Sequence, residues 1–186
     1  MYYMLSCFGP ADDDRASLGD LPPTAEHDWL RGARFETSPR EPLEITLDPA
    51  SPGVLVPMFA GGVVLFSELM LRALLDCGVD NLEWYDVALV DPASGARHTH
   101  YKAVNVIGAV RCADLARSQY TAYGEALVDT DFDSLTIDPA RALGLKMFRL
   151  AECVTGVVVH ESVKRHLEAI PELRLLEFVP PDQWIG

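Results

Sequence analysis

Hydrophobic positions fall into a regular pattern from residue 63 onward, first at strand spacing and then at helix spacing. The run "VVLF" (63–66) is β-branched and aromatic, which predicts a short strand. The next stretch, "SELMLRALLDCG", repeats apolar residues at helical spacing, with Ser67 as the predicted N-cap and Gly78 as the C-terminal stop. With "LEWYDVALV" (82–90) as a following strand, the pattern predicts a strand-helix-strand unit.

The remainder of the chain predicts a hairpin and a second unit of the same kind. "HYKAVNVIGAV" (100–110) follows strand 82–90 after the turn-rich "DPASGARH", which indicates a long antiparallel hairpin. The segment "VVHESVKRHLEAI" matches "LFSELMLRALLDC" when Glu161 is placed over Glu68. An internal duplication and the general likeness of short strand-helix-strand segments both explain this match. Further short strands are predicted at 135–138, 146–150 and 157–160.

Residues 1–62 differ in composition from the rest of the chain. Pro and Gly punctuate this region, and only short strands at 2–7 and 43–47 are predicted within it. We expect a loop-rich N-terminal region packed on a core formed by residues 63–186, in one compact domain overall. The predicted fold class is α+β, with a mixed, largely antiparallel sheet and two strand-helix-strand units.

The net charge of the chain indicates which classes of partner the protein can bind. The chain of 186 residues has 28 acidic and 15 basic residues, a net charge of −13. Such a charge repels nucleic acid and anionic membrane surfaces, and it speeds encounter with a basic partner. It can equally serve only to keep the protein in solution. We therefore expect no direct nucleic-acid binding.

Cysteine spacing and hydropathy indicate the compartment. The four cysteines contain no C-x-x-C pair, so neither a zinc knuckle nor a redox motif is predicted. No apolar run approaches the ~20 residues that a membrane span needs, and the apolar N-terminus has no positively charged leader. These features predict a cytoplasmic protein with buried free thiols and no membrane association.

The stretch "LVDTDFDS" is the densest group of potential catalytic residues. It places Asp129, Asp131 and Asp133 at alternate positions. A calcium-binding EF-hand loop would need Gly and Glu where this chain has Ser134 and Ala140. The D-x-D-x-T box of haloacid-dehalogenase-like enzymes would need Thr at the position of Asp133. A solvated acidic loop is the favoured interpretation, and a small metal-dependent hydrolase or phosphotransferase is the alternative.

Other chemistry is poorly supported by the sequence. No G-x-S-x-G elbow or phosphate-binding loop occurs, and His98-x-His100 lacks a third ligand. We predict no catalytic residue, cofactor or metal ligand. Trp84 is predicted in the core, whereas Trp29 and Trp184 are either anchors for a partner or caps folded onto the sheet.

Several stretches together resemble a known family. They are "MYYML", "DWLRG", "LFSELMLRALLDCGVDNLEWYDV", "YKAVNVIGAVRCADLARS", "KMFRL" and "GVVVHESVKRHLEA". In order and spacing they are similar to bacterial immunity proteins that accompany polymorphic toxins of contact-dependent or type VI secretion systems. The family's Asp-to-Ser spacing fits Asp114 and Ser118, and its Phe-Arg pair fits Phe148 and Arg149. His160 stands where the family has Ser.

The resemblance implies an α+β protein without enzymatic activity in the bacterial cytosol. Such a protein binds and blocks a cognate toxin, and a nuclease toxin would offer a basic cleft to an acidic surface. An adaptor that loads an effector for secretion is a further alternative. The sequence does not predict an oligomeric state. The candidate toxin-facing residues are Asp12, Asp13, Asp14, Trp29, Asp129, Asp131, Asp133 and Trp184.

Overall fold

The computed structural model describes residues 1–7, 15–19, 21, 27–124 and 130–186. The helices are α1 (Glu68–Asp76) and α2 (Glu161–Glu168), with short 3-10 turns η3 (Pro171–Leu173) and η4 (Pro181–Gln183). The strands are β1 (Tyr2–Ser6), β2 (Leu43–Thr46), β3 (Met58–Phe59), β4 (Val64–Ser67), β5 (Leu82–Val90), β6 (Arg97–His98), β7 (Tyr101–Val106), β8 (Ala109–Val110), β9 (Gln119–Ala122), β10 (Thr130–Ser134), β11 (Met147–Leu150), β12 (Val157–His160) and β13 (Glu177–Val179).

The strands form two mixed sheets and one separate pair. The first sheet has the order β13-β1-β12-β11-β8, in which only β8 and β11 pair in parallel. The second has the order β2-β5-β7-β4-β3, with β6 also paired to β5. In this sheet only β2 and β5 are parallel. The α+β class with a mixed, largely antiparallel sheet is confirmed, and so is the hairpin that pairs β5 with β7.

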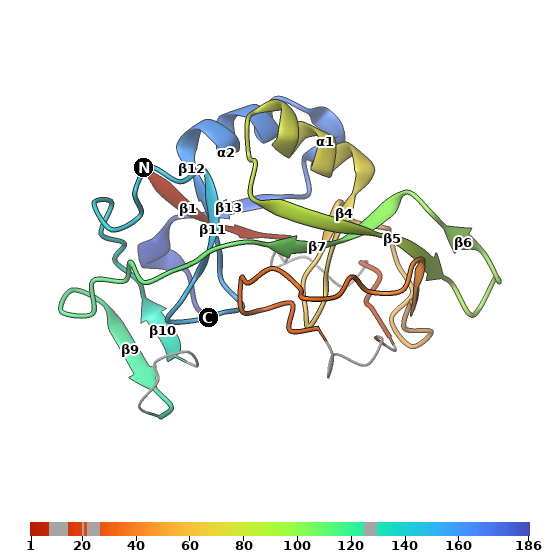
Figure 1. Ribbon diagram of the computed structural model, residues 1–186, viewed down its shortest axis with the longest axis horizontal. Coiled ribbons are helices and arrows are strands. Elements are labelled where there is room, and N and C mark those ends of the chain that lie inside the picture. Colours follow the sequence, from red (N-terminus) through yellow and green to blue (C-terminus); the bar gives the residue numbers. More distant parts are fainter. Residues whose placement is uncertain (8–14, 20, 22–26, 125–129) are drawn as a thin grey trace.

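Both helices begin with a capped strand-to-helix junction. The hydroxyl of Ser67 accepts a hydrogen bond from the amide of Met70 at 3.2 Å, as predicted. At the second junction, the ring nitrogen Nδ1 of His160 accepts from the amide of Ser162 at 3.2 Å. The imidazole therefore takes the capping role that a serine would have. In Figure 1, α1 and α2 lie together at the top of the molecule, over the strands of both sheets.

The two strand-helix-strand units have the same strand arrangement. In the first unit, β4 and β5 flank β7, and both are antiparallel to it. In the second, β12 and β13 flank β1, and both are antiparallel to it. The central strand of the first unit, β7, follows that unit in sequence. The central strand of the second unit, β1, comes from the N-terminus. This shared topology does not depend on common origin, and the internal duplication stays a prediction.

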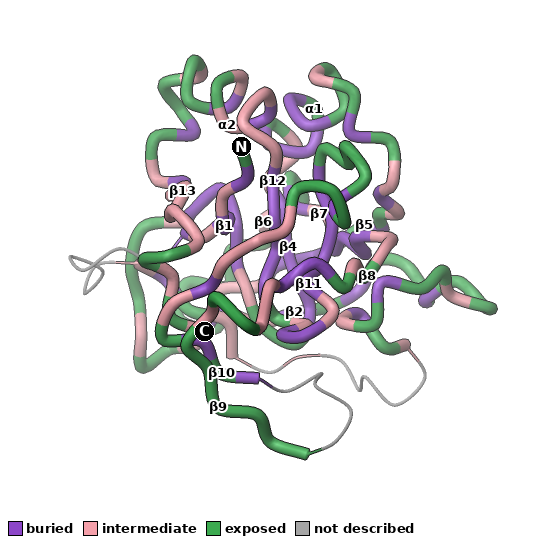
Figure 2. Tube along the Cα trace, turned by 90° about the vertical axis from the view of Figure 1, so that its left-hand side faces the viewer, coloured by how far each residue is buried: buried purple, intermediate pink, exposed green. Residues whose placement is uncertain are grey.

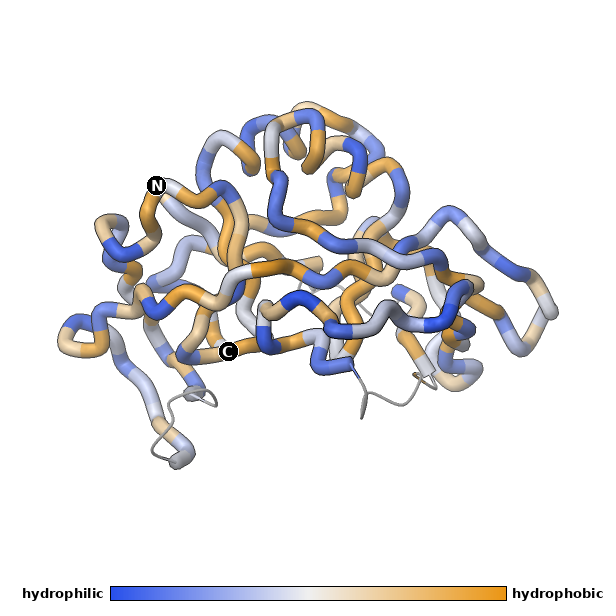
Figure 3. The backbone as a smooth tube through the Cα atoms, viewed as in Figure 1, coloured by the Kyte–Doolittle hydropathy of each residue, from blue (hydrophilic) through white to orange (hydrophobic). Residues whose placement is uncertain are grey.

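The first sheet is buried on both faces because alternate residues enter different hydrophobic clusters. Val157 and Val159 join the cluster that includes α1 and α2, whereas Val158 joins a second cluster on the opposite face. Phe132 of β10 belongs to this second cluster. Figure 2 shows the buried strands below α1 and α2, and Figure 3 shows hydrophobic stretches in the same part of the molecule. β10 is therefore attached to the body of the protein through Phe132.

Three details of the fold depart from or extend the sequence predictions. No strand covers 135–138, where Ile137 makes an isolated bridge to Ala113. Trp84 was predicted in the core but is 45% exposed, and it lies in the part of β5 before residue 87, where β2 does not pair with β5. Residues 1–62 supply strands to both sheets, including β1 in the middle of one. Within the described residues, neither helix has the length and apolarity to cross a lipid bilayer.

Candidate functional site

β9 and β10 form a two-stranded antiparallel sheet, which we call the arm (Gln119–Ala122 and Thr130–Ser134). Thr130 pairs with Ala122 and Phe132 pairs with Tyr120. The arm projects from the side of the molecule opposite α1 and α2 (Figure 1), and every residue of β9 is exposed, as its green tube in Figure 2 shows. The arm thus presents backbone and side chains to solvent.

The residues of β10 alternate between the interior and the surface. Thr130 and Phe132 are buried, whereas Asp131 and Asp133 are exposed. Two carboxylates therefore stand on one face of a strand. The prediction of an acidic loop is wrong for residues 130–134, because Thr130 and Phe132 give the stretch a strand period of two that stabilises it against the core. The predicted exposure of both carboxylates is confirmed.

Phe132 is the anchor of the arm. It is 1% exposed, and its ring lies 6.0 Å from that of Tyr120 and 6.3 Å from that of Trp184. The backbone amide of Phe132 also donates to the Gly186 carbonyl, and the Gly186 amide donates back at 3.2 Å. β10 is consequently held on one side by β9 and on the other by the C-terminal residue.

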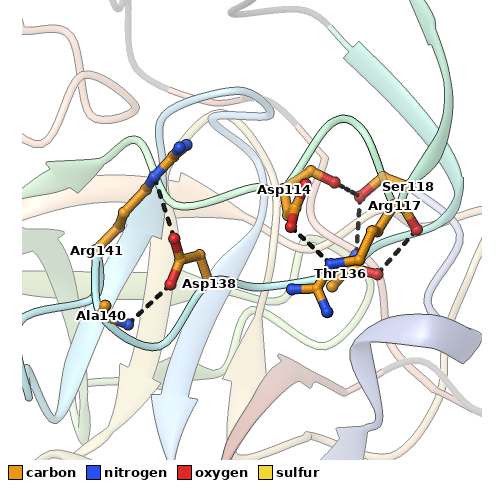
Figure 4. A network of polar contacts seen from close by, with 7 residues as sticks. All are labelled: Asp114, Arg117, Ser118, Thr136, Asp138, Ala140 and Arg141. Carbon is orange, nitrogen blue, oxygen red and sulfur yellow. Dashed lines mark hydrogen bonds and ion pairs between the residues drawn. The ribbon is translucent and has the colours of Figure 1, made fainter.

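A polar network closes the base of the arm (Figure 4). The hydroxyl of Ser118 donates to the carbonyl of Asp114 at 2.8 Å and accepts from the amide of Thr136 at 2.9 Å. The hydroxyl of Thr136 donates to the Arg117 carbonyl at 3.0 Å, and the Asp114 amide donates to the Thr136 carbonyl at 2.8 Å. The residues just before β9 and just after β10 are thereby joined.

Ion pairs neutralise the basic residues around this base. Nε of Arg117 lies 2.6 Å from Oδ2 of Asp114, and Nε of Arg141 lies 3.2 Å from Oδ2 of Asp138. The hydrogen bond from Arg117 holds the pKa of the Asp114 carboxyl below its ordinary value. Because these arginines are already paired, the negative potential of Asp131 and Asp133 is left for an approaching partner.

Two exposed tyrosines lie in and just after β9 and were not singled out from the sequence; Tyr120 pairs with Phe132 and so lies on the face of the arm opposite Asp131. Tyr120 is 38% exposed and Tyr123 is 57% exposed. Tyrosine is enriched where proteins bind proteins, because its ring is large, rigid and able to form a hydrogen bond. The signal in the sequence was the alternation "QYTAY" before Gly124, which is typical of an exposed strand.

The tryptophans predicted as partner anchors lie elsewhere. Trp29 is only 2% exposed, with its ring edge-on to Phe35 at 4.8 Å and to Tyr85 at 5.7 Å. The expectation that Trp29 faces a toxin is therefore wrong: three aromatic rings enclose one another and exclude a partner. Trp184 is half-buried and packs against the cluster that contains Phe132. Through this cluster, Trp184 helps to hold the arm on the body of the protein.

Some of the predicted acidic residues cannot be placed. Asp12, Asp13, Asp14 and Asp129 lie outside the described residues. Across the part of the chain that is described, no three His, Cys, Asp or Glu side chains come close enough together to hold a metal ion. Asp131 and Asp133 thus form a surface pair among the described residues, and the prediction of a metal-dependent enzyme is not tested by them.

Comparisons with known proteins do not assign the chain to a family. No model of a protein family matches the sequence, and no curated protein matches it significantly. The arguments for function therefore rest on the residues and their geometry.

Proposed function

We propose that this protein is an immunity protein, which binds an antibacterial toxin in the bacterial cell that produces it and blocks the toxin without catalysing a reaction. Its sequence resembles the immunity proteins of polymorphic toxin systems. The observation that carries the proposal is the arm, which displays Asp131 and Asp133 on an exposed face of a chain with net charge −13. A toxin with a basic surface is the partner that this charge favours.

The geometry of the arm suits fast and tight capture. An acidic surface accelerates encounter with a basic cleft, and rapid capture matters when the free toxin harms its own producer. A cleft that cuts nucleic acid must attract phosphates, so a nuclease is the toxin class that fits best. The anchoring of Phe132 and the network at Ser118 hold the arm in place, which reduces the conformational entropy lost on binding.

A rescue experiment tests this function. The toxin-like C-terminal domain encoded beside this gene is induced in cells with and without the full chain, survivors are counted, and the tagged chain is purified from the same cells. We expect survival only when the chain is present, together with a stable complex. An unrelated protein of similar size and net charge is the control, because it separates specific neutralisation from general charge effects.

The other outcomes distinguish the alternative functions. A stable complex without survival would favour an adaptor that loads the effector for secretion. Death of the cells with neither a complex nor any delay, despite good expression of the chain, would contradict the proposal for this toxin.

A further inference from the structure

A second site lies where the segment 28–32 meets β8. Gly32 has a positive φ of +66°, and its carbonyl accepts a hydrogen bond from the Gly108 amide at 2.8 Å. A Cβ atom at residue 32 would stand 2.9 Å from the backbone of both Gly108 and Ala109. Glycine is required here because the two backbones touch. This contact fixes Asp28 and Arg31 beside the end of the first sheet.

The two segments enclose a pocket of about 490 Å³, which we call the arginine pocket. Arg31 and Arg111 stand at its rim, and both are exposed. Asp28 and Val154 form part of its wall. The volume falls in the range of small-molecule sites. Two arginines at one pocket are notable in a chain that has nearly twice as many acidic as basic residues.

A third arginine lies behind the wall of the arginine pocket. Arg149 of β11 is fully buried, and its Nη1 donates to the carbonyl of Val154 at 2.9 Å. Its Nε and Nη2 have no hydrogen-bond partner among the described residues. Burial lowers the pKa of Arg149 to about 10, opposed by the nearby charge of Asp28, so the guanidinium stays protonated at neutral pH. A buried cation with two unused donors is costly unless an acceptor reaches it.

The acidic groups near this arginine do not satisfy it. Oδ1 of Asp28 accepts from the Leu30 amide at 3.1 Å, and its Oδ2 lies 2.7 Å from Nε of Arg31. Glu152 interacts with Arg111, and burial raises the pKa of the Glu152 carboxyl above its ordinary value. The side chains around the arginine pocket therefore carry more positive than negative charge.

We propose that the arginine pocket binds the oxyanion group, phosphate or carboxylate, of a small molecule. Arginine matches both groups because its planar donors form two parallel charge-assisted hydrogen bonds. Arg31 and Arg111 contact the anion in the pocket, and Arg149 adds its positive charge from behind the wall. The surrounding acidic surface disfavours long polyanions, which leaves a compact anion as the ligand. This site shares no residue with the arm and is independent of the proposed neutralisation of a toxin.

Nuclear magnetic resonance of the full chain tests the proposal. Sodium phosphate and sodium acetate are titrated separately at constant ionic strength, with sodium chloride as the reference. Resonances are followed for the amides of Arg31, Arg111 and Val154 and for the Arg149 Nε–H group, which the Arg149→Lys variant identifies. Melting temperature is not the readout, because phosphate stabilises proteins generally by exclusion from their surface.

The expected result is saturable movement of these signals with phosphate, with acetate or with both, which also tells which oxyanion the pocket prefers. The double variant Arg31→Gln/Arg111→Gln should weaken binding roughly ten-fold or more, since charge-assisted hydrogen bonds are lost. Both side chains are exposed, so this variant should fold even if Arg149→Lys does not. Arg97→Gln, which removes an exposed arginine paired with Glu44, is the matched control and should bind as the wild type does.

Two outcomes would overturn the proposal. One is the lack of saturable movement with either anion into the tens of millimolar range. The other is equal binding by the double variant and by Arg97→Gln, because the signals would then report general ionic effects and not the arginine pocket.

Discussion

The hydroxyl of Ser118 accepts a hydrogen bond from the amide of Thr136 at 2.9 Å, although the two residues are 18 positions apart. Ser118 immediately precedes β9, and Thr136 follows shortly after β10. The same hydroxyl donates to the carbonyl of Asp114. One side chain therefore ties the two ends of the arm to the body of the protein, so that the exposed carboxylates are held by a closed base.

Removal of this hydroxyl should loosen the arm. Ser118→Ala leaves the Thr136 amide without its acceptor, and we expect a loss of about 1–2 kcal/mol in the free energy of unfolding. Hydrogen exchange of amides in β9 and β10 should also accelerate. Ser94→Ala is the control, because the Ser94 hydroxyl also donates one hydrogen bond, to the Asp91 carboxylate, and accepts one from the Ala96 amide, in an exposed hairpin turn. If hydrogen exchange in β9 and β10 were unchanged in Ser118→Ala, the Ser118 hydroxyl would not hold the arm in place.

The contact between Gly32 and β8 should be sensitive to a single methyl group. Gly95 has a similar positive φ of +72° with open space around it, so Gly95→Ala measures backbone strain alone, expected to be about 1–2 kcal/mol. Gly32→Ala adds a collision with backbone atoms and should cost about 1–3 kcal/mol more. Urea denaturation of both variants gives the difference. Equal losses would show that the two backbones can move apart without cost.

Trp29 should contribute more to the stability of the protein than Trp84, although the sequence predicts Trp84 in the core. Trp29→Ala empties a buried aromatic cluster and should cost about 3–5 kcal/mol. Trp84→Ala removes a side chain that is 45% exposed and should cost at most about 1 kcal/mol. Thermal unfolding monitored by circular dichroism compares the two. A larger loss for Trp84→Ala would place that residue in the core after all.

Glu152 should make the stability depend on pH. Burial raises the pKa of this carboxyl above its ordinary value of 4.5, so the folded state holds the proton more tightly than the unfolded state. The proton on Glu152 contributes fully to the free energy of unfolding below pH 4.5, and this contribution declines as the pH rises through the raised pKa. Glu152→Gln keeps an oxygen for the Ala113 amide but does not ionise.

The variant should therefore match the wild type most closely near pH 4 and become more stable than it toward pH 8. Free energies of unfolding measured across this interval test the sign. Glu172→Gln, at an exposed position, should run parallel to the wild type. If the stability of Glu152→Gln relative to the wild type fell as the pH rises, the raised pKa of Glu152 would be contradicted.

Local signals account for the parts of the fold that the sequence predicted well. Ser67 and Gly78 bound α1 because a cap and a left-handed stop act within a few residues. Trp84 illustrates the limit: its strand was predicted correctly, but the extent to which β2, distant in sequence, pairs along β5 cannot be predicted from the local pattern. The place of β1 between β12 and β13 likewise follows from long-range pairing that no local pattern encodes.

The candidate site was predicted in part for the same reason. Asp131 and Asp133 were recognised by their charge, whereas the burial of Thr130 and Phe132 between them, which makes the stretch a strand, was overlooked. The arginine pocket could not be predicted at all. Arg31, Arg111 and Arg149 are widely separated along the chain. The pairing of β8 with β11 brings Arg111 near Arg149, and the docking of Gly32 on β8 adds Arg31.

We propose above that the carboxylates of the arm attract a basic toxin. The most direct test is the association rate with the toxin domain of the rescue experiment, measured by stopped flow over a range of salt concentrations. The double variant Asp131→Asn/Asp133→Asn is compared with Asp76→Asn/Asp80→Asn, which removes the same charge from exposed positions at the end of α1, far from the arm.

We expect the arm variant to associate roughly three- to ten-fold more slowly at low salt and with a flatter salt dependence, whereas the α1 variant should stay close to the wild type. Unchanged association of the arm variant, or an equal decrease in both variants, would contradict the assignment of the arm as the toxin-facing surface.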